Sequence, residues 1–193
     1  MTAQTGAFPA GAACHTEGDV EMKTKKLAVL ALLTATALIL FVVESLLPTF
    51  VPIPGVKLGL SNIVTVCVLF LFGRKQALAV LLVRVVLGSI LTGQTGALPY
   101  SLSGGLLSLL AVGLLRPLFS HRQLWIAGML GAVFHNVGQM AAAVILTQTV
   151  SLLVYLPVLI LCGLFTGLFT GLCAQFLWTR LKKIDPTGSG GNS

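Results

Sequence analysis

Arg84 is the residue whose position most needs an explanation, because its guanidinium interrupts the apolar run LLVRVVLGSI, residues 81–90. On membrane-insertion scales an arginine at the centre of an apolar helix costs roughly 2.5–3.5 kcal/mol, so its side chain should face protein or a polar cavity. A planar guanidinium with five donors binds carboxylate and phosphate groups bidentately. Two interpretations are open: Arg84 anchors an anionic ligand, or it forms a structural pair with Glu44 or with helix carbonyls.

A second polar group interrupts the apolar run at residues 124–147, where His135, Asn136 and Gln139 occur at positions i, i+1 and i+4. This spacing places the three side chains on nearly one face of a helix. Hydrogen bonding between helices alone would also explain such residues. We predict a ligand site that combines both groups with polar residues near the ends of other apolar runs: Arg84, His135, Asn136, Gln139, Asn62, Lys57, Glu44, Tyr100 and Ser103.

The composition indicates what must position these side chains. Of the 193 residues, 56% are hydrophobic and only 9% are charged, whereas soluble domains have about 25% charged residues. We therefore expect an all-α membrane bundle of six transmembrane helices, each long enough or nearly long enough to cross a hydrocarbon core of about 30 Å. The predicted spans are 27–47, 60–73, 75–92, 97–115, 124–147 and 150–179; the second is short and follows a proline-rich loop.

Topology follows from the basic residues. Ten of the twelve Lys and Arg residues lie in the two terminal segments and in the second and fourth connections. By the positive-inside rule, this predicts a multi-pass protein of the cell membrane with both termini in the cytoplasm. The predicted organisation is a disordered tail over 1–26, a membrane domain over 27–180 and a C-terminal tail over 181–193. The charges are scattered over separate loops, so we expect the lipid bilayer and no nucleic acid as a partner.

Helix geometry converts this topology into depth. Arg84 lies about 14 Å and His135 about 17 Å from the cytoplasmic end of their helices, whereas Glu44 lies about 25 Å along its helix, near the outer surface. By this count an Arg84–Glu44 pair would be strained. Because the polar residues gather in the outer half, we predict a cavity that is open to the outside and closed below.

Several catalytic classes lack their residues here. A prenyl-transfer site needs clustered aspartates to hold magnesium, and the chain has only Asp19 and Asp185, one in each terminal segment. It also lacks the G-x-x-x-x-G-K-[ST] loop that holds nucleotide phosphates. We therefore expect no enzyme activity, no cofactor and no metal site.

Small residues predict close helix packing in two places. GLFTGLFTG carries Gly163, Gly167 and Gly171 as two overlapping GxxxG steps, for which internal packing is the favoured interpretation. Ala28, Ala31 and Ala35 form a second small stripe in the first span, and the residues alone do not decide whether it packs internally or against a partner.

Three segments, PIPGVKLGLSNIVTV (52–66), GRKQALAVLLVRVVLGSILTG (73–93) and SLSGGLLSLL (101–110), resemble the Gx transporter family, also labelled heptaprenyl diphosphate synthase component I. The similarity covers roughly residues 24–180. This family looks related to the substrate-binding S-components of energy-coupling factor transporters, which have six helices and an outward ligand pocket.

The resemblance implies a substrate-binding subunit of an importer that captures a small, anionic or phosphate-bearing molecule. It also implies a transmembrane coupling subunit and cytoplasmic ATPases as partners. In S-components a small-residue face on the first helix docks on the coupling subunit, which favours a partner interface at Ala28, Ala31 and Ala35. The alternative is a non-catalytic membrane accessory subunit for prenyl diphosphate synthesis or for extracytoplasmic electron transfer.

Overall fold

The computed structural model describes residues 11–46, 59–119 and 123–184, and every element in them is helical. Three short 3-10 helices (η1, Thr95–Ala97; η2, Arg116–Leu118; η4, Val150–Tyr155) accompany the α-helices. The α-helices are α1 (Gly11–Leu46), α2 (Asn62–Phe72), α3 (Arg74–Leu91), α4 (Leu98–Leu115), α5 (Leu124–Thr147) and α6 (Leu156–Ile184). The predicted all-α class is thus confirmed for this part of the chain.

Helix length separates the six α-helices into two groups. Four stretches are long and apolar enough to cross a membrane: Lys23–Leu46, Thr95–Leu118, Leu124–Thr147 and Val150–Phe176. The helix α2 has only 11 residues, and α3 has 18 residues, among them Arg74, Lys75 and Arg84. Apolar helices of this kind indicate a membrane protein, while the crossing of the bilayer by all six stays a prediction.

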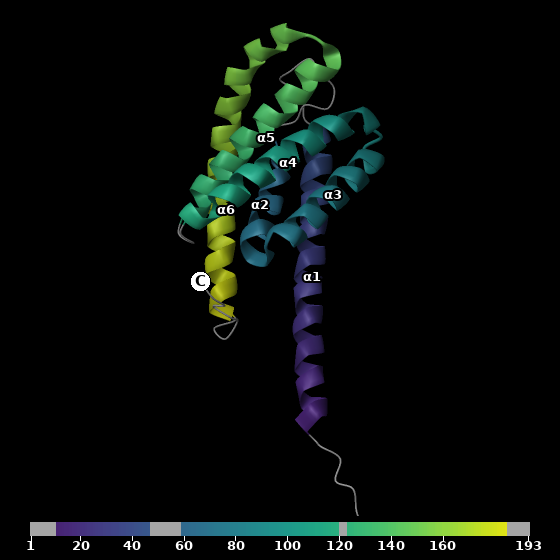
Figure 1. Ribbon diagram of the computed structural model, residues 1–193, viewed down its shortest axis with the longest axis vertical. Coiled ribbons are helices and arrows are strands. Elements are labelled where there is room, and N and C mark those ends of the chain that lie inside the picture. Colours follow the sequence, from purple (N-terminus) through teal and green to yellow (C-terminus); the bar gives the residue numbers. More distant parts are fainter. Residues whose placement is uncertain (1–10, 47–58, 120–122, 185–193) are drawn as a thin grey trace, which may run out of the picture.

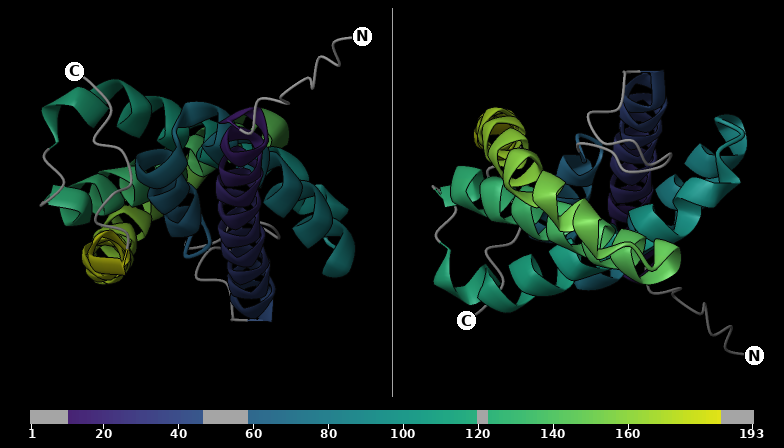
Figure 2. Two further views of the ribbon diagram at one scale, coloured as in Figure 1. Left: turned by 90° about the horizontal axis from the view of Figure 1, so that it is seen from below. Right: turned by 90° about the horizontal axis from the view of Figure 1, so that it is seen from above.

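The short helix α2 lies at the centre of the bundle and contacts each of the five other α-helices. Figure 2 shows α2 between α1 and α6 in the view from below. Eight of its eleven residues are buried, and its side chains join the main apolar core with residues of α1, α3, α4 and α5. An 11-residue helix can lie at membrane depth here because protein covers it on most sides.

The helix pairs with the most extensive contact are α4 with α5 and α5 with α6. The three glycines Gly163, Gly167 and Gly171 lie on α6 against α5, where an added Cβ at Gly167 would come within 2.7 Å of the Cα of Met129. At Gly171 it would come within 2.6 Å of the Cα of Trp125. The internal packing predicted for this stripe is therefore confirmed.

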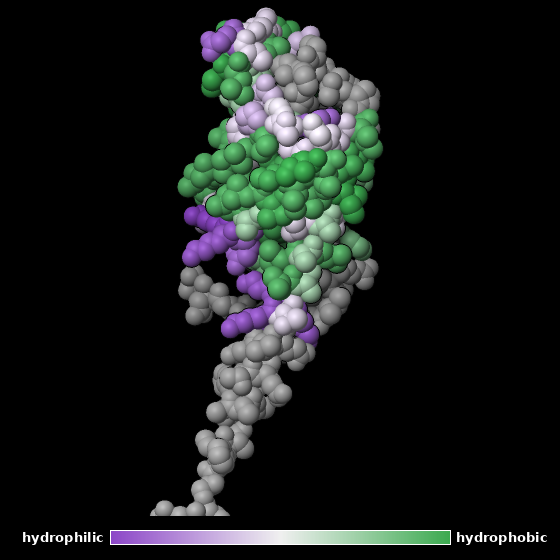
Figure 3. Space-filling model, turned by 90° about the vertical axis from the view of Figure 1, so that its right-hand side faces the viewer, coloured by the Kyte–Doolittle hydropathy of each residue, from purple (hydrophilic) through white to green (hydrophobic). Residues whose placement is uncertain are grey.

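The surface of the bundle is apolar. Large exposed side chains include Leu32, Ile39, Leu91, Phe165 and Phe169. In Figure 3 such residues form a broad hydrophobic region, and hydrophilic residues gather below it, on the side toward which α1 begins. This distribution is what a helix bundle in a bilayer requires.

Both ends of the described chain point the same way: the first turns of α1 and the last turns of α6 extend beyond the bundle in the same direction (Figure 1). The helix α1 starts at Gly11, inside the segment 1–26 for which we predicted a disordered tail, and α6 ends at Ile184, a few residues beyond 180. No proline interrupts residues 11–26, so nothing in the backbone chemistry prevents the helix from extending there. Assignment of both ends to the cytoplasm stays a prediction.

Candidate functional site

A turn inside the bundle precedes α2. Gly59 has a positive φ of 81°, a conformation that glycine adopts without steric cost. The amide of Asn62 donates to the carbonyl of Gly59 (2.9 Å) and the amide of Ile63 to that of Leu60 (3.4 Å). Ser61 and Asn62 are buried, so the N-terminal end of α2 lies within protein.

Glu44 of α1 binds this turn. Its Oε1 accepts hydrogen bonds from the amide of Gly59 and, at 3.3 Å, from the amide of Leu60. The side chain is only 5% exposed. A carboxylate at the N-terminal end of a helix is favourable because the unpaired amides and the helix dipole both attract negative charge.

Arg84 of α3 reaches the same turn. Its Nη1 donates to Oγ of Ser61 at 2.7 Å, and its charge is attracted by Glu44. The side chain is 1% exposed. Its Nε is buried and has no hydrogen-bond partner among the residues that the structure describes.

His135 and Gln139 of α5 complete the arrangement from the opposite side. The amide nitrogen of Gln139 lies 3.1 Å from Nε2 of His135. A Cβ added to Gly59 would meet Cδ2 of His135 at 2.5 Å, and one added to Gly104 of α4 would meet its Nδ1 at 2.9 Å. The imidazole thus fits between two glycines, close enough to Arg84 for an electrostatic interaction.

These contacts define what we call the polar cluster. It joins α1, α3 and α5 around the turn before α2, and its side chains are all buried. A neutral ring that accepts at Nε2 carries its proton on Nδ1, and this Nδ1 lies against the backbone of Gly104. The cluster consists of Glu44, Ser61, Arg84, His135 and Gln139.

One depth argument from the sequence is wrong. Counting residues placed Glu44 about half a helix length outside Arg84, which would strain a pair. In the structure α1 packs on α3 and both contact α2, and the helices are inclined to one another (Figure 1). The two charged groups therefore contact consecutive residues of one turn. The count failed because the number of residues along a helix gives depth only when the helix is perpendicular to the membrane.

Two predicted site residues form hydrogen bonds between helices. Nδ2 of Asn62 donates to Oγ of Ser108 at 2.6 Å and to the carbonyl of Gly131 at 3.4 Å. Nδ2 of Asn136 donates to the carbonyl of Leu159 on α6 at 2.7 Å. Asn136 therefore faces α6 rather than the imidazole of its neighbour, although its Oδ1 and that of Asn62 have no partner among the described residues.

Three further predicted residues lie elsewhere. Oγ of Ser103 donates to the carbonyls of Tyr100 (2.9 Å) and Gly138 (3.1 Å), which ties α4 to α5. Tyr100 packs against a separate apolar cluster around Met140. Lys57 lies outside the described residues. The outward cavity itself stays a prediction.

Sequence reasoning missed the contribution of the turn. Ser61 falls at the start of the predicted span 60–73, but the sequence did not identify it as the partner of Arg84. Gly59 and Gly104 were missed as well. The available signal was the order of residues in KLGLSN: a glycine two residues before a serine at the start of a short helix is typical of a turn with unpaired amides.

The family model described as heptaprenyl diphosphate synthase component I matches residues 33–177, more than half of the chain. The chain belongs to the heptaprenyl diphosphate synthase component I family. No curated protein and no solved structure matches it. The family segment contains the entire polar cluster. It includes Ala35 but begins after Ala28 and Ala31.

Membership in the heptaprenyl diphosphate synthase component I family does not by itself place catalysis on this chain. The two aspartates of the sequence, Asp19 and Asp185, are distant from the polar cluster in sequence. Among the side chains that the structure describes, Glu44 is the one carboxylate, and its Oε1 accepts from the turn amides. The polar cluster thus brings a carboxylate, a guanidinium and an imidazole to one turn, whose two amides before Ser61 donate to the carboxylate.

Proposed function

We propose that this chain is the substrate-binding membrane subunit of an energy-coupling factor type importer and that it captures a small anionic or phosphate-bearing molecule from the outer side. The observation that carries the proposal is the polar cluster at the start of α2. Burying such groups is costly unless they are satisfied, and a purely structural network would leave few of them unpaired. Arg84 Nε supplies a donor that a ligand anion can use.

The position of the cluster suits transport. In transporters, broken helices place their N-terminal ends near anionic substrate groups at membrane depth. Here α2 begins inside the bundle, and Glu44 accepts from the amides of Gly59 and Leu60 in the turn before it. A ligand anion would bind beside Glu44 or in its place, with Arg84 as the common partner.

Retention of a small molecule tests this proposal. The purified protein should release an anionic compound on denaturation, detected by mass spectrometry, and Arg84→Lys should retain at least about tenfold less because the charge remains but the two-pronged donor geometry is lost. Lys75→Gln, at an exposed cation in the first turn of the same helix, is the control and should retain as much as the wild type. Equal retention by Arg84→Lys and wild type would contradict ligand anchoring by Arg84.

The coupling surface gives a separate prediction. Ala28, Ala31 and Ala35 are exposed on α1, on the face opposite the residues that pack into the bundle, such as Ala37 and Phe41. Small residues let two helices approach closely. Ala31→Trp and Ala35→Trp should therefore reduce recovery of a coupling subunit about tenfold or more without changing the melting temperature.

Leu32→Trp is the control for this prediction, because Leu32 is 69% exposed and already large. It should leave recovery of the complex unchanged. If all three variants recover the coupling subunit equally, the alanine face is not the docking surface.

The family name favours a second candidate, a non-catalytic membrane subunit that assists prenyl diphosphate synthesis. The chain would then associate with a soluble synthase that carries the magnesium-binding aspartates. Affinity purification in mild detergent separates the two functions. A coupling subunit with ATPases in stoichiometric amounts supports the importer, and a stoichiometric soluble synthase supports the accessory role.

A further inference from the structure

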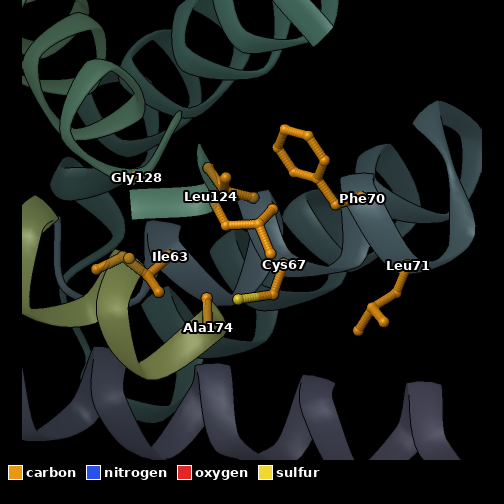
Figure 4. A pocket seen from close by; sticks show the side chains of 9 residues that line it. Ile63, Cys67, Phe70, Leu71, Leu124, Gly128 and Ala174 are labelled. Carbon is orange, nitrogen blue, oxygen red and sulfur yellow. The ribbon is translucent and has the colours of Figure 1, made fainter. Parts of the chain in front are cut away.

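A narrow apolar crevice of about 10 Å³ runs along α2, from Ile63 near the turn before α2 to Leu71 at its far end. It is lined by Cys67, Phe70 and Leu71 of α2, Leu124 of α5, and Gly171 and Ala174 of α6. In Figure 4 the sulfur of Cys67 points toward Ala174, and Phe70 and Leu71 follow along α2. The side chains in this crevice offer an apolar chain only dispersion and hydrophobic contacts.

A basic pocket of about 530 Å³ adjoins the crevice, and Phe70 lines both. The other lining residues are Arg74, Arg116, Pro117 and Phe119. Arg116 lies over the ring of Phe70, with its Cζ 6.0 Å from the ring centre. Nη2 of Arg74 donates to the carbonyl of Gly113 at 2.6 Å, which fixes the guanidinium at the end of α4.

The positive charge of this pocket is not neutralised by the described part of the chain. Glu44 is the single carboxylate among the side chains that the structure describes, and it binds the turn before α2. Lys26 of α1 adds a third cation nearby, with its Nζ 5.7 Å from the ring centre of Phe72. Three cations and an apolar crevice thus meet at the turn between α2 and α3.

The end of α2 beside the basic pocket is partly exposed. The helices α1 and α6 flank α2 (Figure 2), and Leu71 near its C-terminal end is partly exposed. An apolar chain that lay against Leu71 would keep an attached anionic group at the level of Arg74 and Arg116.

We propose that this end of the bundle is a binding site for an anionic phospholipid, with the phosphate between Arg74 and Arg116 and one acyl chain against the partly exposed side chain of Leu71. Basic pockets between membrane helices bind anionic head groups through such arginines. The site is separate from the polar cluster and does not depend on the proposed transport function. Phe70 connects the two parts, because its ring lies under the guanidinium of Arg116 and also lines the crevice.

Lipid titration of the purified full-length protein, read by native mass spectrometry, tests the head group. Phosphatidylglycerol should bind more tightly than phosphatidylcholine, and removal of each arginine should weaken it about fivefold. The structure shows no hydrogen bond from Arg116 to the backbone, so Arg116→Gln tests the charge without loosening α4. In the double variant Arg74→Gln/Arg116→Gln, the affinity for phosphatidylglycerol should fall about twenty-five-fold. Lys75→Gln, an exposed neighbour that does not line the pocket, is the control of equal charge change and should bind like the wild type.

The apolar part is tested with Leu71→Gln, which replaces the partly exposed apolar side chain beside the pocket and should weaken phosphatidylglycerol binding while leaving the arginines in place. Equal binding of both phospholipids, or an equal loss in Lys75→Gln, would overturn the proposal. Displacement of the lipid by glycerol phosphate at equal concentration would overturn it in favour of a free phosphate site. Preferential binding of farnesyl diphosphate over phosphatidylglycerol would overturn it in favour of an isoprenoid ligand.

Discussion

Arg84→Ala is expected to lower the free energy of unfolding by about 3–5 kcal/mol, because removing one member of a buried charged pair leaves the other uncompensated. Glu44 would remain buried at the turn before α2, and Ser61 would lose its donor. The measurement is thermal and denaturant-induced unfolding of the purified protein in detergent. Lys75→Ala, an exposed cation in the first turn of the same helix, is the control and should change stability by less than about 0.5 kcal/mol.

A double-mutant cycle with Glu44→Gln tests whether the two groups act as a unit. Arg84→Ala together with Glu44→Gln should cost less than the sum of the two single changes, by roughly 0.5–3 kcal/mol, because both charges are removed at once. Additive losses would show that the turn does not couple them. The polar cluster would then be two independent contacts.

Arg84→Lys distinguishes the structural role of the arginine from its proposed ligand role. The lysine keeps a charge near Glu44 but presents a single ammonium in place of a planar fork. If Arg84 anchors a ligand, the variant remains folded and loses the retained anion. If the residue is structural only, stability falls and retention per folded molecule stays at the wild-type level.

Gly167→Ala is the second change with a large expected effect, a loss of about 1–3 kcal/mol from one added methyl group. The new Cβ would lie 2.7 Å from the Cα of Met129 and 2.9 Å from the carbonyl oxygen of Gly128. Both atoms belong to the backbone of α5, so the clash cannot be relieved by a side-chain rotation and the two helices must separate. The melting temperature in detergent reports the loss.

Gly96→Ala provides the matched control, since a Cβ at Gly96 meets nothing within 4 Å and its backbone is not left-handed. Its melting temperature should equal that of the wild type within error. A similar decrease in both variants would contradict a specific clash between α5 and α6, because the effect of Gly→Ala on the unfolded chain is stabilising.

The sequence by itself indicated six helical segments and the limits of the middle ones, because an apolar run of membrane length is a local property; the limits of α6 and the start of α1 differ from the predicted spans. The predicted spans 75–92, 97–115 and 124–147 agree with α3, α4 and α5 within one residue at either end. It also identified the glycine face of α6, since GxxxG spacing repeats on one side of a helix whatever the neighbour is. Burial of Arg84, His135 and Gln139 followed from the cost of exposing polar groups to lipid.

Only the tertiary structure decided which of these groups meet. Asn136 and His135 are adjacent in sequence, yet the first bonds to α6 and the second lies between Gly59 and Gly104. Glu44 and Arg84 are far apart by residue count but contact one turn, because inclination and crossing of helices depend on packing and not on residue number. Local patterns determine which residues are buried, whereas the partner of each buried group depends on the positions of several helices at once.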